Sequence, residues 1–184
     1  MKLLQLLPIG NFDGKLLRDL QHTIPQFLGA HGEDVPCDVL PVVLDPAPAF
    51  HGERQQYHSS ELLRRMQDYV GPRCWRLLGV TSVDLYIPIL TFVFGEAQIG
   101  GPCALVSTHR LRQEFYGLEA DCELLRQRLL KESIHELGHT IDLKHCHDYE
   151  CVMASSHAVE WIDLRGTELC EACRAQVLAN VTEL

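Results

Sequence analysis

The sequence predicts an α/β (α+β) fold: a twisted mixed sheet of about five strands with backing helices, a long helix and a small C-terminal subdomain. Three observations predict this fold. The N-terminal part alternates strand-like and helical patterns, three more strand-like segments follow, and one long helical pattern then leads into a Cys/His-rich region. The chain has 184 residues, 46% hydrophobic and 22% charged, which is enough for a single domain with its own core.

The N-terminal part is expected to alternate strand and helix. KLLQLLPIG (2–10) is strand-like, and GKLLRDLQHTIPQFLG (14–29) has helical periodicity. VLPVVL (39–44) predicts a short buried strand, and SSELLRRMQDYVG (59–71) predicts a second helix. This order favours parallel strands joined by helical crossovers.

The following segments predict three strands and one long helix. WRLLGVT (75–81), ILTFVFG (89–95) and CALVSTHRL (103–111) read as strands, and their short connections favour antiparallel pairing. A helix is predicted from 118 to 141, followed by irregular chain until a short helix near 171–180.

Charge and hydropathy exclude several classes of partner. The formal net charge is -9 and no Lys/Arg-rich run is present, so neither nucleic acid nor an anionic membrane surface is expected to bind. No window reaches the roughly 18 apolar residues of a membrane span. The start, MKLLQLLPIG, fits a first strand better than a signal peptide, so we expect a cytoplasmic protein. A monomer is expected, although no pattern fixes the oligomeric state.

The segment HELGHTIDLKHC (135–146) contains a candidate metal site. His135 and His139 are four residues apart, which places both imidazoles on one face of a helix, where they can bind one Zn²⁺. Glu136 is rotated by about 100° and can reach a water on the metal without ligating it. This is the H-E-x-x-H pattern of metallohydrolases, which by itself also arises by chance on polar helices.

His145 can join this pair only if the helix ends soon after His139. In a continued helix it would lie about 240° round the axis from His139. The chain must therefore fold back through a residue that tolerates φ > 0. Asp142 is one of the few residue types besides Gly that are enriched there.

Three other residues of the helix have simpler interpretations. Gly138 is expected to allow close packing against a neighbouring element, because glycine costs about 1 kcal/mol relative to alanine within a helix. Lys131 and Glu132 are expected to form a solvated face.

The eight cysteines fall into two groups. A disulfide framework is not expected in a cytoplasmic chain. Four cysteines occur singly and are expected to be buried free thiols: Cys37, Cys74, Cys103 and Cys122. The other four form C-x4-C and C-x2-C pairs separated by eighteen residues, a zinc-site signature: Cys146, Cys151, Cys170 and Cys173.

These motifs together resemble a known family. HELGHTIDLKHC resembles the metzincin motif H-E-x-x-H-x-x-G-x-x-H, with Asp142 in place of Gly. CHDYECVM (146–153) and CEAC (170–173) are similar to the archaemetzincins, which extend the motif with C-x4-C-x-M and a distal C-x2-C. FVFGEA and the later Ser107, Arg110 and Leu111 also resemble that family.

The resemblance implies two zinc ions. The implied ligands of a catalytic zinc are His135, His139 and His145, and those of a structural zinc are Cys146, Cys151, Cys170 and Cys173. Glu136 is implied as general base and Met153 as the Met-turn residue beneath the imidazoles. Three protein ligands leave a coordination position for water, whereas four thiolates close the metal shell.

The expected function is that of a zinc metallopeptidase acting on peptide or protein substrates. We expect a single domain over 1–184, with an N-terminal subdomain (1–143) that ends in the active-site helix and a zinc-stapled C-terminal subdomain (144–184). The strand ending in FGEA is expected to form the upper rim of the substrate cleft, because an exposed edge can pair with an extended peptide.

Two alternatives use the same residues. A zinc-dependent binding or scaffold module would show little or no turnover, but it has no need of Glu136. A zinc hydrolase of non-peptide amides would keep every group named above. Specificity, and the choice between cleavage inside a chain and cleavage from its N-terminus, have no signature in the sequence.

Overall fold

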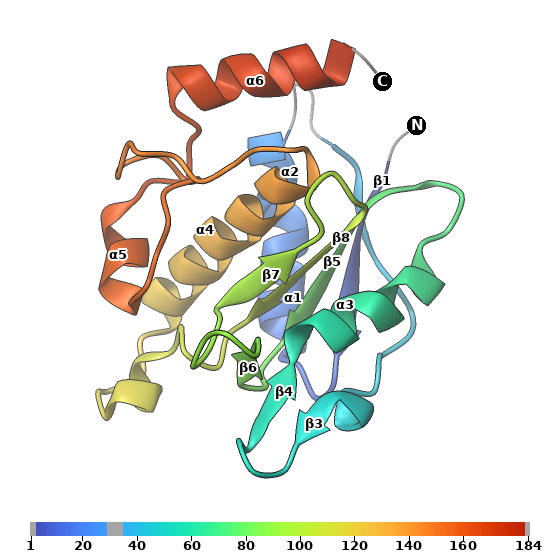
Figure 1. Ribbon diagram of the computed structural model, residues 1–184, viewed down its shortest axis with the longest axis vertical. Coiled ribbons are helices and arrows are strands. Elements are labelled where there is room, and N and C mark those ends of the chain that lie inside the picture. Colours follow the sequence, from blue (N-terminus) through green and yellow to red (C-terminus); the bar gives the residue numbers. More distant parts are fainter. Residues whose placement is uncertain (1–2, 29–34, 183–184) are drawn as a thin grey trace.

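A mixed five-stranded sheet forms the centre of the computed structural model, which describes residues 3–28 and 35–182 (Figure 1). The strand order is β2-β1-β5-β8-β7, with bounds Cys37–Val39, Leu3–Ile9, Cys74–Thr81, Cys103–Ser107 and Gly95–Ala97. The first four strands run parallel, and β7 pairs antiparallel with β8 at one edge. The predicted mixed sheet is therefore confirmed.

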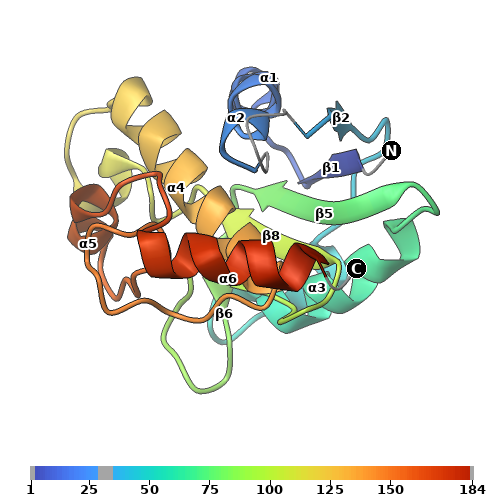
Figure 2. The ribbon, with the colours of Figure 1, turned by 90° about the horizontal axis from the view of Figure 1, so that it is seen from above.

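Helices cover both faces of this sheet. Helices α1 (Gly14–Thr23), α2 (Pro25–Leu28) and α4 (Cys122–Thr140) share one face, and α3 (Ser59–Met66) packs on the other. Figure 2 shows α1 and α3 on opposite sides of β5. Because side chains alternate along a strand, Leu78 and Val80 of β5 enter the α1/α4 layer, whereas Leu77 enters the α3 layer.

Among the segments 75–81, 89–95 and 103–111, the expected antiparallel pairing occurs only between β7, which begins at Gly95, and β8. Strands β5 and β8 are parallel, with Leu77 opposite Cys103. The chain between them first runs outward through β6 (Leu85–Tyr86) and returns through β7, so the connection is a crossover and not a hairpin. In the five-stranded sheet, as far as the structure describes the chain, β7–β8 is the one antiparallel pair.

The segment 89–95 is mainly a loop and not the predicted strand. Before β7 it makes only an isolated bridge, between Val93 and Leu85. Arg54 Nη2 donates to the carbonyls of Leu90 and Thr91 at 2.8 and 3.1 Å. Side chains therefore satisfy these backbone groups, which a neighbouring strand would otherwise bind.

A second, smaller sheet supports this loop. It consists of β3 (Phe50–His51), β4 (Gln56–His58) and β6, in the order β3-β4-β6. It was not predicted, because strands this short have no recognisable period. The strand predicted over 39–44 is also displaced: β2 ends at Val39, and Leu44 makes only an isolated bridge with Ile9.

The C-terminal part contains one helix that was not predicted. Helix α5 (Val159–Leu164) precedes α6 (Glu171–Thr182), which matches the predicted last helix.

Helix α4 begins at Cys122, later than predicted, because the Asp121 side chain caps the Leu124 amide. Cys122 is consequently exposed and not buried as expected. Within the described residues, no helix has the length and apolar character needed to cross a membrane.

Candidate metal centres

The second half of α4 carries the first two histidines of the motif. Every residue from Glu132 to Thr140 is buried, because this half lies between the sheet and the C-terminal segment. The Nε2 atoms of His135 and His139 are 3.2 Å apart. The helical spacing therefore brings the two rings together as the sequence predicts.

The turn after the helix returns the chain towards these rings. The Asp142 amide donates to His139 O and the Leu143 amide to Gly138 O, each at 3.1 Å, with Asp142 at φ 66°. This pair of bonds is a Schellman cap with Asp142 in the left-handed position. The turn expected at Asp142 is confirmed, and it stacks the His145 ring 5.3 Å from that of His135, centroid to centroid.

The three histidines fit a zinc ion. One ligand nitrogen from each of His135, His139 and His145 can be chosen so that all lie within 4.8 Å of one another. Two nitrogens on a tetrahedral zinc with bonds of about 2.0–2.1 Å would be roughly 3.3 Å apart, close to the 3.2 Å between the first two rings. The donor set, and the spacing of its first two nitrogens, therefore fit a zinc ion.

Backbone carbonyls and burial prepare these imidazoles as ligands. His135 Nδ1 lies 2.9 Å from Val152 O, and His139 Nδ1 lies 2.8 Å from Leu143 O. A proton donated from Nδ1 leaves the Nε2 lone pair for a metal. Burial, together with the charge of His139, lowers the pKa of His135 to about 3, and burial also lowers those of His139 and His145. All three rings are thus neutral at physiological pH, as metal binding requires.

Glu136 lies beside the three histidines and is not part of the ligand cluster. Burial, followed by the negative charge of Glu96, raises its pKa to about 8. A Cβ added at Gly95 would lie 2.7 Å from Glu136 Cγ and 2.6 Å from Leu105 O. Glycine at this position therefore allows α4 to bring Glu136 against the edge strand β7.

A cleft of about 450 Å³ contains the three histidines and Glu136. One wall is the segment 90–97, which includes β7, and the facing wall is the segment 155–157 that follows Met153. In the described part of the chain, β7 is the last strand on its side of the sheet. The FGEA strand thus lies at the cleft with a free edge, the position expected for its rim.

Met153 is completely buried against α4. A Cβ added at Gly138 would fall on Met153 Sδ and lie 3.0 Å from its Cε. The expectation that Gly138 permits close packing is confirmed, and its neighbour is the proposed Met-turn residue. This contact lies within the helical turn between His135 and His139.

We expect Gly138→Ala to lower the free energy of unfolding by about 1–3 kcal/mol, although alanine is the better helix former by about 1 kcal/mol. The added methyl group must displace Met153 or the helix. Urea unfolding of Gly138→Ala, Met153→Ala and the double variant measures this contact. The double variant should lose less than the sum of the two single losses, and strict additivity would contradict the proposed contact.

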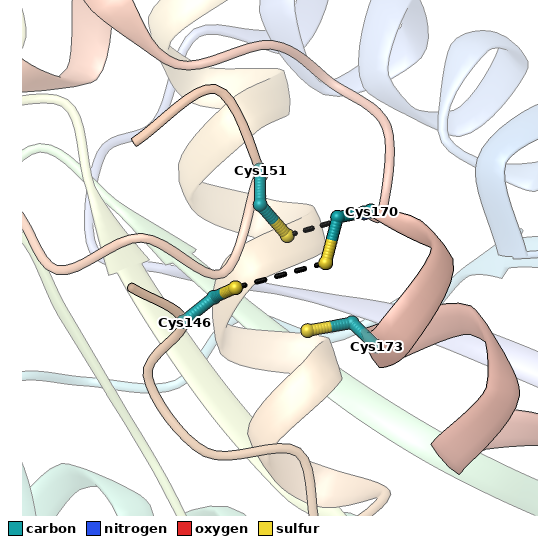
Figure 3. A group of neighbouring side chains, drawn as sticks. All are labelled: Cys146, Cys151, Cys170 and Cys173. Atoms are coloured by element: carbon teal, nitrogen blue, oxygen red, sulfur yellow. Dashed lines mark hydrogen bonds between the residues drawn. The ribbon is translucent and has the colours of Figure 1, made fainter. Parts of the chain in front are cut away.

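The four clustered cysteines meet between the turn after α4 and the start of α6 (Figure 3). Their sulfur atoms lie within 4.8 Å of one another, and Cys146 Sγ is 3.7 Å from Cys170 Sγ. A disulfide would bring two sulfurs to about 2.05 Å, whereas two thiolates on a tetrahedral zinc lie roughly 3.8 Å apart. The Cys170 amide also donates to Cys151 Sγ at 3.3 Å. The cluster, completed by Cys173, fits a four-thiolate zinc site.

The two clusters are joined through a short segment. His145 and Cys146 are adjacent in sequence, and the Cys146 amide donates to Met153 O at 2.9 Å. Two adjacent residues therefore contribute a histidine to the first cluster, a cysteine to the second and a hydrogen bond to the backbone at Met153.

The expectation that Lys131 and Glu132 form a solvated face is wrong. Glu132 is 3% exposed and forms an ion pair with Arg165. Lys131 Nζ donates to the carbonyls of Ile162 and Asp163, both at 3.1 Å. The sequence contains no local signal for these contacts, because the partners lie in the unpredicted helix α5 or directly after it.

Comparison with known proteins matches this chain and its fold to a family of peptidases. The sequence model described as Peptidase family M54 matches residues 26–179. The archaemetzincin of Methanocaldococcus jannaschii is 37% identical over 169 residues, covering 90% of this chain and 87% of that protein. The archaemetzincin of Thermococcus kodakarensis is 35% identical over 184 residues, covering 98% of each.

Solved structures agree with these sequence matches. The crystal structure of the Archaeoglobus fulgidus archaemetzincin has a TM-score of 0.79 and 32% identity, covering 95% of this chain and 99% of that one. The Methanopyrus kandleri archaemetzincin has a TM-score of 0.81 and 32% identity, covering 98% and 96%. The protein is a zinc-dependent metallopeptidase. It belongs to peptidase family M54, the archaemetzincins.

Proposed function

We propose that this peptidase uses a catalytic zinc held by His135, His139 and His145, with Glu136 as general base. The convergence of three neutral imidazoles in one cleft is the observation that carries the assignment. A zinc ion held there polarises the scissile carbonyl and lowers the pKa of a bound water to about 7.

Other groups in the cleft transfer the proton and align the peptide. Glu136 accepts the proton of the attacking water and transfers it to the leaving amine. Burial, which raises the pKa of this carboxyl, favours its accepting a proton, while a zinc ion held by the three histidines would favour its charged form before the reaction. The free edge of β7 offers backbone groups that align an extended peptide across the cleft.

A second, structural zinc is held by Cys146, Cys151, Cys170 and Cys173. Their spacing supports a closed shell without a position for substrate. We further propose that the chain forms one domain with subdomains 1–143 and 144–184, joined where the helix cap reverses the chain. In this arrangement the structural zinc holds the segment that presents His145 and Met153.

The protein is proposed to work as a cytoplasmic monomer that does not bind nucleic acid. Its negative charge and the lack of any basic run support the last point. Its substrates are peptides or proteins. Glu136 in the cleft disfavours a scaffold without turnover, because metal binding alone does not require a base at that position.

Cleavage of a mixed peptide library, followed by mass spectrometry, tests this proposal. Zinc-loaded protein should cut the library, and the same protein treated with a chelator should not until zinc is restored. Half of the peptides carry blocked N-termini, so that their survival or cleavage separates an aminopeptidase from an endopeptidase. Failure to cut any peptide, with two zinc ions per chain confirmed by elemental analysis, would favour the binding module instead.

A further inference from the structure

Arg165 is a buried arginine directly after α5, at the base of the cleft. The residue is 1% exposed, although most arginines in proteins keep their guanidinium in water. It lines the cleft together with Glu132 and His135. Burying a guanidinium costs free energy, which its hydrogen bonds and ion pair must offset. The groups that Arg165 contacts therefore indicate its role.

Those contacts connect α4 to the turn around Met153. Arg165 Nη2 forms the ion pair with Glu132. Its Nη1 donates to Ala154 O at 2.8 Å and to Val152 O at 3.1 Å. These two carbonyls flank Met153, so one guanidinium fixes the backbone on both sides of that residue.

The Val152 carbonyl is also the partner of His135. His135 Nδ1 lies 2.9 Å from it, and Arg165 Nη1 lies 2.8 Å from the same Nδ1. With Val152 O held in place as acceptor, the favoured tautomer carries its proton on Nδ1 and leaves the Nε2 lone pair free. If the guanidinium donated to Nδ1 instead, the proton would move to Nε2 and block metal binding.

One face of α4 also holds the end of α5, directly before Arg165. Arg128 forms two hydrogen bonds to the Asp163 carboxylate at 2.7 and 2.6 Å, and Lys131 holds the carbonyls of Ile162 and Asp163. Residues 128, 131, 132 and 135 follow a spacing of three, four and seven from the first, which places them on one side of the helix. The helix face that anchors the end of α5 therefore also presents His135.

We propose that Arg165 and Glu132 are positioning residues of the three-histidine centre, which hold Val152 O so that His135 keeps its Nε2 for the metal. This inference rests on the proposed role of His135 as a zinc ligand. Glu132 supplies the negative charge that holds the guanidinium where its Nη1 donates to the Val152 and Ala154 carbonyls.

If the Glu132–Arg165 ion pair served only the stability of the fold, its removal would leave the zinc affinity of a folded variant unchanged. Replacement of a buried ion pair by apolar side chains of similar volume is often neutral or stabilising for the fold. The variant Glu132→Met/Arg165→Met removes both charges together and is therefore expected to fold. A folded variant with a weakened histidine centre separates positioning from stability.

The test measures zinc affinity and the His135 tautomer on folded protein. The variants are Arg165→Met, Arg165→Lys, Glu132→Gln and Glu132→Met/Arg165→Met, with Arg64→Met as a matched control in the exposed Glu61–Arg64 pair. Chelator competition gives the dissociation constant of each zinc. NMR of ¹⁵N-histidine-labelled protein reports the Nδ1–H of His135.

For Arg165→Met we expect the dissociation constant of the histidine zinc to rise about 10–100-fold, the usual range for a residue that orients a metal ligand. The cysteine zinc and the Arg64→Met control should be unchanged. Arg165→Lys should recover part of the loss, because an ammonium can still donate to one carbonyl but lacks the fork. In peptide cleavage, kcat should fall with little change in KM.

Wild-type zinc affinity and an unaltered Nδ1–H resonance in folded Arg165→Met would overturn the inference. If that variant does not fold, Glu132→Gln, which keeps the volume and removes the charge, decides by the same two measurements. If the wild-type histidines bind no zinc, the proposed function fails, and the inference is still decided by whether the His135 Nδ1–H in the zinc-free protein depends on Arg165.

Discussion

Replacing Glu136 with Gln should lower kcat/KM by about 10²–10⁴-fold, the usual contribution of a general base. The amide has almost the same size as the carboxylate, so the close contact with Gly95 is kept. It cannot accept the proton of the attacking water. Because Glu136 is not part of the ligand cluster, the zinc content should remain that of the wild type.

Initial rates on a peptide found in the library, together with zinc analysis, measure this effect. Glu123→Gln is the matched control, since Glu123 lies on the same helix in an exposed pair with Arg126. It should retain wild-type rates. Turnover by zinc-loaded Glu136→Gln at the wild-type rate would remove Glu136 from the mechanism and leave the rest of the cleft without an assigned base.

Replacing Cys170 and Cys173 together with Ser should release the structural zinc, unfold much of the segment after residue 144 and abolish peptide cleavage. In small zinc domains the metal contributes on the order of 10 kcal/mol to folding. The segment 144–158 contains no helix or strand of its own, so it depends on the cluster together with its contacts to Arg165 and the core. His145 and Met153 both lie in this segment.

Hydrogen exchange and zinc analysis of the double variant test this coupling. Protection should be lost around Val152 and Met153 while amides of β1 and β5 remain protected. Cys122→Ser is the matched control, because Cys122 is exposed and outside the cluster. Full protection of the 144–158 segment and an intact histidine zinc would show that the two centres are independent.

Those features of the site that depend on local geometry could be predicted from the sequence. The positions of His135 and His139 follow from the pitch of one helix, and the left-handed turn at Asp142 follows from the need to bring His145 back. The spacing of the four cysteines likewise indicates their cluster. Each of these inferences concerns residues close in sequence or a motif with a fixed spacing.

In the sheet, single elements were predicted from local patterns, whereas the pairing of strands was not. Strand β1 was predicted nearly to the residue, and α3 begins at the predicted Ser59 although it ends at Met66 and not at 71, because each has a clear period of its own. The parallel pairing of β5 with β8 and the loop at 89–94 were not predicted. Both depend on groups far along the chain, such as Arg54, which donates to loop carbonyls thirty-six and thirty-seven residues away.

The sequence by itself determined the family, the metal-ligand candidates and the candidate general base of this protein, because these are encoded in one short motif and its cysteine extension. Only the tertiary structure decided that Gly95 admits Glu136 to the edge strand and that Glu132 is buried with Arg165. The physical reason is that burial and charge pairing depend on which distant surfaces pack together. A glutamate on a helix looks the same in sequence whether water or an arginine thirty-three residues away covers it.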